Sequence, residues 1–476
     1  MTNSICLRCL SRPLAQIEQG VARPALSSLA ISSQASYFST SAPLAANPPK
    51  KKGAVVASKK GGQSFAKQGR VGGGKGGARA SGGKGPDGGE RKALRKRVVL
   101  SNTNALEVQD MADFSAAKLP VDPSQLGQVL GLPFETVDAL RANEAFKPTQ
   151  GWKLFRRPAT LVRKETIEVS NLLQEAEKEQ KSIRRVIYGE RGSGKSVLLL
   201  QAMAIAHLKN WLVIHIPEAQ ELIIGHTSYI PNTSGDVTTY IQPQYTAQIL
   251  GAIGKANYAV LSKLQLSQKH DLPIPVQENI SLARFCELGA RDPDLAWPFY
   301  LAFWKEITGA GRPPICFAVD GVNHIMKESA YLDADLSKVH SHDLAIVQHF
   351  NALLSGKQSL ANGGLVLAAD AGSNRPAVPA FDFAISKTQA AQDSKDAPTW
   401  DPYVQVDRRV LDVMQNVPVT RLEGLSRDEA KGIMEYYAKS GMLRSTVNDR
   451  LLGEKWTLSG GGIIGAFEKA SVMLRV

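Results

Sequence analysis

Residues 184–200, RRVIYGERGSGKSVLLL, decide the fold of this chain. An apolar run typical of a β-strand, 186–188, comes first, and a helical run, 197–208, comes last. The phosphate-binding pattern G-x-x-x-x-G-K-[ST] lies between them and consists of Gly189, Glu190, Arg191, Gly192, Ser193, Gly194, Lys195 and Ser196. Strand, loop and helix in this order predict an α/β protein of the P-loop NTPase class. The alternative is a glycine-rich turn that binds nothing.

Each part of the pattern has a chemical reason. Glycine lets the backbone curl until successive N–H groups point at an anion. The N-terminus of the following helix adds positive charge. Lys195 is expected to reach the β- and γ-phosphates, and the Ser196 hydroxyl is expected to bind Mg²⁺. We therefore expect all eight residues of the pattern to contact a nucleotide.

A second segment supplies an acidic residue to the expected site. Residues 315–320, ICFAVD, indicate a buried strand that ends in Asp320. In P-loop proteins the carboxylate at the end of such a strand meets the Mg²⁺ shell that the loop serine begins. We expect this strand to lie beside the loop strand, with Ser196 and Asp320 as the Mg²⁺ ligands. The next residue is Gly321, whereas many active ATPases carry a glutamate at this position that activates water. We therefore expect hydrolysis to be slow or absent, and enzymatic activity stays uncertain.

Positive charge is concentrated near the N-terminus. Residues 1–98 contain 18 Lys and Arg against three acidic residues, whereas the rest of the chain contains 39 against 41. Residues 1–45 are rich in Arg and Ser and poor in acids, which is typical of a mitochondrial transit peptide. The alternative is an N-terminal tail that carries no targeting signal. No apolar run approaches the ~18 residues of a membrane span.

Residues 46–98 mix Gly with Lys and Arg and contain too few apolar residues to form a core. We expect a disordered basic arm. Its cations would bind RNA or DNA phosphates in a salt-sensitive way that does not depend on base sequence. A solvated linker is the alternative.

The rest of the chain divides into three predicted parts. Residues 99–165 are expected to pack as an extension on the core, residues 166–423 to form the nucleotide-binding α/β domain, and residues 424–476 to form a small helical lid. Aromatic residues between 297 and 304 are expected in the core. Residues 371–408 are expected to form a long polar loop outside it.

Several other residues invite functional interpretations. Residues 158–164 precede the loop strand and are expected to help enclose the nucleotide base. Asp370 ends another apolar run and could face the γ-phosphate. The glycine triplet 460–462 could bind phosphate, but a turn is favoured because no strand precedes it. No metal site is expected at Cys6, Cys9, His340, His342 and His349, because the sequence around them lacks the further ligands that a metal site needs.

Six strings of residues resemble the death-associated protein 3 family. They are WKLFRRPATLVRK at 152–164, YGERGSGKS at 188–196, NWLVIHIPEA at 210–219, YIQP at 240–243, AVDG at 318–321 and LSGG at 458–461. The string WLVIHIPEA is the most specific of them. The resemblance runs from about Trp152 to the C-terminus and covers about two-thirds of the chain.

That family is the P-loop protein of the mitochondrial ribosomal small subunit. The resemblance implies contacts with small-subunit rRNA and neighbouring ribosomal proteins, bridges to the large subunit, and a location in the mitochondrial matrix. It also implies a bound GTP or GDP with Mg²⁺, in a fold closer to the AAA-type ATPases than to Ras. The N-K-x-D motif with which Ras-type proteins read guanine is absent from this sequence, so ATP stays the alternative.

We favour a structural ribosomal protein whose nucleotide stabilises the domain. One alternative is an active AAA-type ATPase or GTPase that remodels RNA or a nucleoprotein complex in mitochondria. That activity needs a water-activating residue and usually an arginine from a second molecule. A signalling switch linked to cell death is a further alternative, suggested by the family name alone.

Overall fold

Five parallel strands form the central sheet of the computed structural model, which describes residues 88–234 and 237–473. Their spatial order is β11–β3–β10–β7–β4. The bounds are β3 Ser182–Gly189, β4 Leu212–Ile216, β7 Ile315–Asp320, β10 Gly364–Ala369 and β11 Val419–Leu422. The described residues all belong to one compact unit, residues 81–476. The expected α/β class and the parallel sheet with flanking helices are confirmed, whereas the predictions for 1–45 and for 46–87 lie outside the described residues.

The position of β7 corrects one expectation. The strand that ends in Asp320 was expected beside the loop strand β3, but β10 lies between them and pairs with both. Six consecutive buried residues make β10 suited to the middle of a sheet that is covered on both faces. Sequence order does not reveal this insertion, because a crossover helix can skip a position in a parallel sheet. The register aligns Ala369 with Asp320, so both strands end at the same edge.

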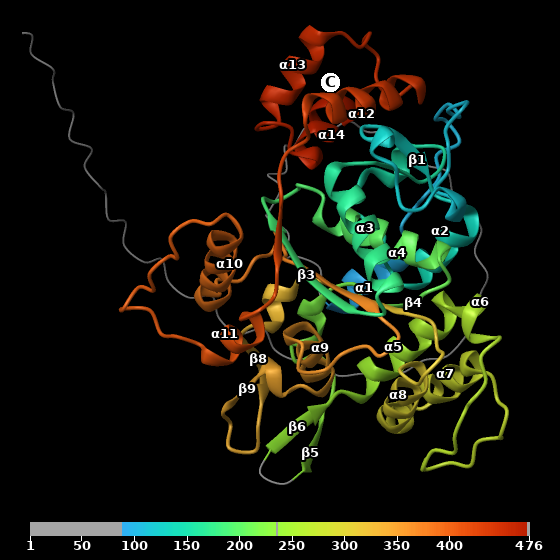
Figure 1. The fold of residues 1–476 in the computed structure, drawn as a ribbon, viewed down its shortest axis with the longest axis vertical. Coiled ribbons are helices and arrows are strands. Elements are labelled where there is room, and N and C mark those ends of the chain that lie inside the picture. Colours follow the sequence, from blue (N-terminus) through green and yellow to red (C-terminus); the bar gives the residue numbers. More distant parts are fainter. Residues whose placement is uncertain (1–87, 235–236, 474–476) are drawn as a thin grey trace, which may run out of the picture. The chain divides into compact units, whose positions relative to one another are not determined.

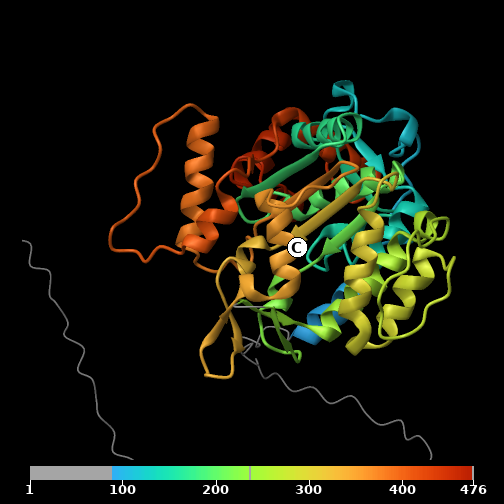
Figure 2. The same cartoon turned by 60° about the horizontal axis from the view of Figure 1, so that its bottom comes forward.

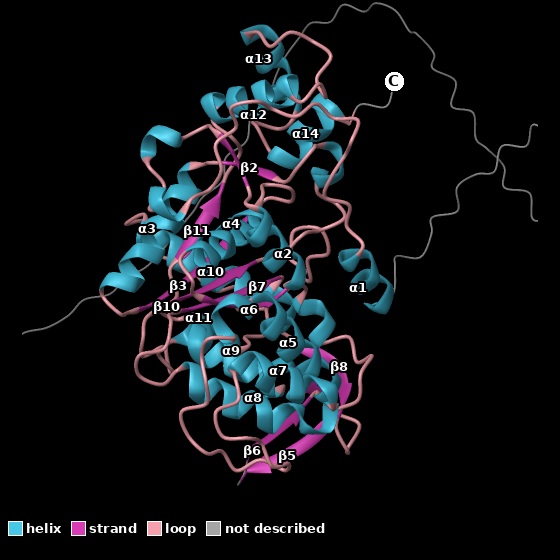
Figure 3. Cartoon of the chain, turned by 90° about the vertical axis from the view of Figure 1, so that its right-hand side faces the viewer, coloured by secondary structure: helices cyan, strands magenta, loops and turns pink. Residues whose placement is uncertain are grey.

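Helices cover both faces of the sheet (Figure 3). One face carries α2 Phe134–Ala142, α3 Lys164–Lys178 and α4 Lys195–Leu208. The other carries α5 Pro243–Ala256, α6 Tyr258–Leu261, α7 Leu282–Arg291, α8 Pro293–Ile307, α9 Ala345–Ser355, α10 Pro379–Gln392 and α11 Arg408–Met414. Strand residues alternate between the two layers, as the two-residue period of a strand requires. Phe317 and Val319 face one core, and Cys316 and Ala318 face the other.

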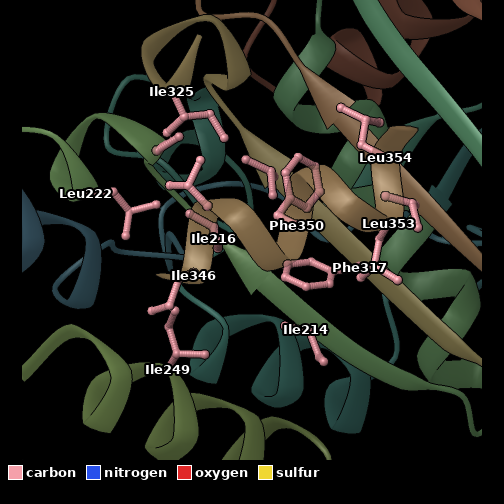
Figure 4. Close-up of a cluster of buried hydrophobic side chains, with 14 of the residues drawn as sticks. Ile214, Ile216, Leu222, Ile249, Phe317, Ile325, Ile346, Phe350, Leu353 and Leu354 are labelled. Carbon is pink, nitrogen blue, oxygen red and sulfur yellow. The ribbon is translucent and has the colours of Figure 1, made fainter. Parts of the chain in front are cut away.

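Figure 4 shows the larger core, where Ile214 and Phe317 of the sheet meet Phe350, Leu353 and Leu354 of α9. The aromatic stretch that was expected in the core lies in α8, where Phe299 and Phe303 are fully buried. None of the described helices combines the length and the apolar character that a membrane crossing requires.

The prediction of a long loop over residues 371–408 is wrong. This range contains the 14-residue helix α10, and its Phe381 is fully buried in the larger core. Pro379 occupies the first turn of α10, where proline is tolerated because the first amide groups of a helix need no acceptor. Pro379 therefore marks the start of a helix.

Two hairpins project from the sheet domain and were not predicted. They are β5 Ile230–Ser234 with β6 Val237–Ile241, and β8 Glu328–Leu332 with β9 Lys338–His340. Figure 2 shows the two hairpins on the same side of the sheet domain. Tyr229 joins them, because its ring lies 5.4 Å from the ring of Tyr331 and its hydroxyl donates to the carbonyl of Leu332 at 2.5 Å.

The C-terminal helices form their own small core, at the red end of the chain in Figure 1. They are α12 Arg427–Lys439, α13 Asp449–Leu458 and α14 Ile464–Val472. They pack beside the antiparallel pair β1 Val129–Gly131 and β2 Ala159–Leu161. A capping box starts α12, since the Glu429 amide donates to Ser426 Oγ at 3.2 Å and the Ser426 amide donates to Glu429 Oε2 at 2.8 Å. Helices were predicted here, and the expected turn at 460–462 is confirmed by three glycines of positive φ.

The prediction of disorder is wrong for the last residues of the basic arm. Residues Gly88–Lys96 form helix α1, and its Arg95 is buried. The Arg95 guanidinium donates to Glu144 at 3.1 Å, to Glu221 at 2.8 Å and to Glu218. Three carboxylates satisfy a cation that would otherwise be costly to bury. The sheet domain therefore begins near residue 88.

Candidate functional site

The 189–196 loop connects the carboxyl end of β3 to the start of α4. The strand ends at Gly189 and the helix begins at Lys195. Gly192 and Gly194 have φ angles of +82° and +104°. Only glycine adopts this left-handed conformation without strain. The tight turn therefore explains why the pattern needs glycine at these two positions.

The loop presents hydrogen-bond donors that the protein does not use. The backbone N–H groups of the loop that have no acceptor among the residues that the structure describes include those of Gly192, Gly194, Lys195 and Ser196. The Ser193 hydroxyl is buried and has no partner there either, while Glu190 and Arg191 are exposed. Free N–H groups at the N-terminus of a helix favour an anion, so this loop fits a phosphate group.

Lys195 folds back onto its own loop. Its ammonium donates to the carbonyl oxygens of Gly189 at 2.7 Å and Glu190 at 2.8 Å, and lies 3.2 Å from Asp370 Oδ1. The Asp370 side chain is 1% exposed. Burial raises the pKa of this carboxyl above its ordinary value, and the charge of Lys195 counteracts that rise. The structure thus brings Asp370 to the loop, next to the ammonium that was expected to bind phosphate.

Asp320 is paired with a cation from a distant part of the chain. Its side chain is 5% exposed and forms an ion pair with Lys147, which lies in the turn after α2. The hydroxyl of Ser196 has no partner among the described residues. Ser196 therefore fits the predicted Mg²⁺ site, whereas the carboxylate of Asp320 already neutralises Lys147.

The turn after β7 is held to the turn after β10. Gly321 has a φ of +85° and leads into a short 3-10 helix, Val322–Ile325. The Ala371 amide donates to Asn323 Oδ1 at 2.9 Å, and Asn323 Nδ2 donates to the Ala371 carbonyl at 3.3 Å. This paired contact fixes the edge of the sheet at which Asp320 and Asp370 lie.

Two parts of the chain hold the outer side of the loop. The Gly465 amide at the start of α14 donates to the Gly192 carbonyl at 2.9 Å. Arg163, just before α3, donates to the Ser193 carbonyl at 2.9 Å and to the Glu423 carbonyl at 2.9 Å. Since Glu423 lies between β11 and α12, Arg163 joins the loop to the connection that leads to the C-terminal helices.

Known proteins resemble this chain over most of its length. The family described as mitochondrial ribosomal death-associated protein 3 matches residues 160–470. The chain is 40% identical over 486 residues to small ribosomal subunit protein mS29 of Neurospora crassa, and the alignment covers 99% of both chains. The chain belongs to the mitochondrial ribosomal death-associated protein 3 family. A Schizosaccharomyces pombe protein of the same name is 24% identical over 343 residues, which are 70% of this chain and 69% of that one.

Membership of the death-associated protein 3 family makes the chain a mitochondrial ribosomal protein. The predicted resemblance and the predicted location in the mitochondrial matrix are confirmed. The matched range contains the 189–196 loop, Asp320 and Asp370. It also contains Arg163, which lies in the 158–164 segment that was expected near the nucleotide base, but not Lys147. Sequence reasoning missed Lys147 and the contact of Arg163 with the loop, because each of these contacts joins segments that are distant in sequence.

A partly buried carboxyl on α14 of this family member gives a pH prediction. Burial of Glu468 against Gly151 raises its pKa to about 7, from an ordinary value of 4.5. The folded pKa exceeds the unfolded one, so this contribution to stability is fully present below pH 4.5 and is lost as the pH rises through 7. Glu468→Gln should therefore raise the free energy of unfolding at pH 8, by up to roughly 3 kcal/mol, and much less at pH 5.

Urea unfolding at both pH values measures this difference. Glu435→Gln, at an exposed position of α12, is the matched control and should change stability equally little at either pH. An effect of Glu468→Gln that is the same at pH 5 and pH 8 would contradict the assignment of the titrating group.

Proposed function

We propose that the chain is a structural component of the mitochondrial small ribosomal subunit and that it holds a purine nucleotide, GTP or GDP, at the 189–196 loop. The observation that supports nucleotide binding is the set of N–H groups around Gly192 and Gly194 that have no acceptor in the described part of the chain, with Lys195 beside them. A diphosphate or triphosphate would satisfy these donors and draw the ammonium away from the loop carbonyls. Family membership supports the ribosomal part of the proposal.

A P-loop site is also supported by the order of the strands. β10 pairs with the loop strand β3, β7 pairs with β10, and the residues at the carboxyl ends of these two strands are Asp370 and Asp320. Ser196 would hold Mg²⁺, which supplies positive charge to neutralise phosphate oxygens. The chain's own contributions are the loop amides, which bind phosphate, and the C-terminal helices, which restrict water on the outer side of the loop.

The arrangement favours retention of nucleotide over turnover. The position after Asp320 is Gly321, and the Asn323 side chain is engaged with Ala371. Asp370 is held beside Lys195. An active ATPase or GTPase would need a free water-activating base at this edge. We therefore expect slow or absent hydrolysis, and multiple turnover that is lost in Asp320→Asn would favour the alternative.

The proposed partners are small-subunit rRNA and neighbouring ribosomal proteins, with bridges to the large subunit. The basic residues of 46–98 would contact rRNA phosphates, as their charge suggests. Binding of rRNA by the full chain should then weaken steeply with salt, and removal of residues 46–87 should reduce that dependence. An unchanged salt dependence would leave this segment as a linker.

Sedimentation of the endogenous protein tests the proposal. We expect the protein to migrate with the small ribosomal subunit, and we expect the purified protein to release guanine nucleotide in near-equimolar amount when it is denatured. Chromatography of the released nucleotide distinguishes GTP, GDP and ATP. A free pool that does not sediment with the subunit would contradict the ribosomal role, and protein without any nucleotide would contradict the second part.

A further inference from the structure

The ion pair between Lys147 and Asp320 brings a positive charge to a place where a metal ion was expected. Asp320 is almost fully buried, with a side chain 5% exposed, while the side chain of Lys147 is 26% exposed. A buried carboxylate needs a partner, because an uncompensated charge in the interior is costly. Lys147 meets that need from within the chain.

The turn that carries Lys147 is held by its own hydrogen bonds. The Lys147 amide donates to Gln150 Oε1 at 2.9 Å, and the Gln150 amide donates to the Lys147 carbonyl at 3.1 Å. The Trp152 indole donates to the same Gln150 oxygen. Phe146 packs edge-on against Trp152, with ring centroids 5.1 Å apart. These contacts hold the backbone of Lys147 in one place relative to its neighbours.

The same turn is also tied to the sheet and to α1. His215 on β4 bonds through Nδ1 to the Asn143 carbonyl at 2.9 Å. Arg95 of α1 donates to Glu144 at 3.1 Å. Anchors on both sides distinguish Lys147 from a surface lysine that meets a carboxylate by chance. The cation is therefore a built part of this edge of the sheet.

We propose that Lys147 is an internal cation that competes with Mg²⁺ for Asp320, so that the protein retains guanine nucleotide with little dependence on Mg²⁺. This inference rests on the proposed nucleotide binding at the 189–196 loop. An ammonium group and a divalent ion repel each other, so a carboxylate that already neutralises Lys147 attracts Mg²⁺ more weakly. The ammonium also supplies positive charge at the end of the strand that was expected to hold Mg²⁺.

The dissociation constant of GDP for the purified full chain tests the inference. It is measured with saturating MgCl₂ and again with excess EDTA. For the wild type we expect the two constants to agree within about threefold. For Lys147→Met, in which Asp320 is free to bind a metal, we expect GDP to bind at least about tenfold more weakly in EDTA than in Mg²⁺, a difference of about 1.4 kcal/mol.

Two further variants make the test specific. Lys153→Met removes an exposed lysine six residues further along and should behave as the wild type does. Lys147→Arg keeps the charge and should also keep the low dependence on Mg²⁺. The dependence of GDP binding on Mg²⁺ is measured on the wild type alone, so it can refute the inference even if Lys147→Met does not fold.

The possible failures are distinguishable. If the wild type binds no GDP in either buffer, the proposed nucleotide function itself fails. If the wild type binds GDP at least tenfold more weakly in EDTA than in MgCl₂, the proposed nucleotide function stands and the role of Lys147 is refuted. The role of Lys147 would also be refuted if the ratio of the GDP dissociation constants in EDTA and in MgCl₂ were the same in the wild type and in Lys147→Met.

Discussion

A Lys195→Ala protein is expected to lose the thermal stabilisation that GDP gives to the wild type. A ligand that binds only the folded state stabilises it by RT ln(1 + [L]/Kd), which is about 4 kcal/mol at a thousandfold excess over Kd. The ammonium of Lys195 is the nearest cation to the loop carbonyls and to Asp370. Without it, the loop amides would bind phosphate alone. We expect most of the stabilisation by GDP to disappear.

The readout is the shift in melting temperature on addition of GDP, because the absolute melting temperature has a second cause. Lys195→Ala also leaves Asp370 without its nearest cation. Burial raises the pKa of that carboxyl, so it can take up a proton instead of staying charged. Lys181→Ala, at a side chain 61% exposed, is the matched control and should keep the full shift. A normal GDP shift in Lys195→Ala would contradict the proposed binding site.

Arg95→Ala should destabilise the protein without any ligand. The Arg95 side chain is 4% exposed and meets three carboxylates, two of which, Glu221 and Glu144, are 6% and 14% exposed. Removal of one member of a buried charge network leaves the others unpaired, which costs about 3–5 kcal/mol. We expect α1 to detach and residues 88–97 to become accessible to trypsin.

Urea unfolding and limited proteolysis measure the two parts of this prediction. Arg97→Ala, at an exposed position just after α1, is the control and should change the free energy of unfolding by less than about 0.5 kcal/mol. Wild-type stability together with unchanged trypsin cleavage in Arg95→Ala would show that α1 does not anchor on the sheet domain.

Short sequence patterns predicted those parts of the fold that form from residues close together in sequence. The loop motif, the apolar run before Asp320 and the capping box at Ser426 each lie within a few residues, and the structure contains the expected strand or helix at each. The order of strands in the sheet could not be predicted, because it depends on how crossover segments pack. The same limit explains why β10 was not expected between β3 and β7.

The contacts around the candidate site were harder to predict than its backbone. Lys147 and Asp320 are separated by 173 positions, and Arg163 and Ser193 by 30. A lysine or arginine at such a distance has no signature that distinguishes it from a solvent-exposed one. The helix α1 was missed for a similar reason, since the carboxylates that hold its Arg95 lie at least 49 positions away.

The hydrogen bond between Gly465 and Gly192 has a consequence for biosynthesis. It joins the first half of the sheet domain to a residue that follows Gly192 by 273 positions. A nascent chain, or one that threads into an organelle with its N-terminus leading, lacks this bond until Gly465 has also arrived. The loop thus reaches its final surroundings only after α14 has packed, and a truncation after α13 would remove this bond and so affect the 189–196 loop, which lies far away in sequence.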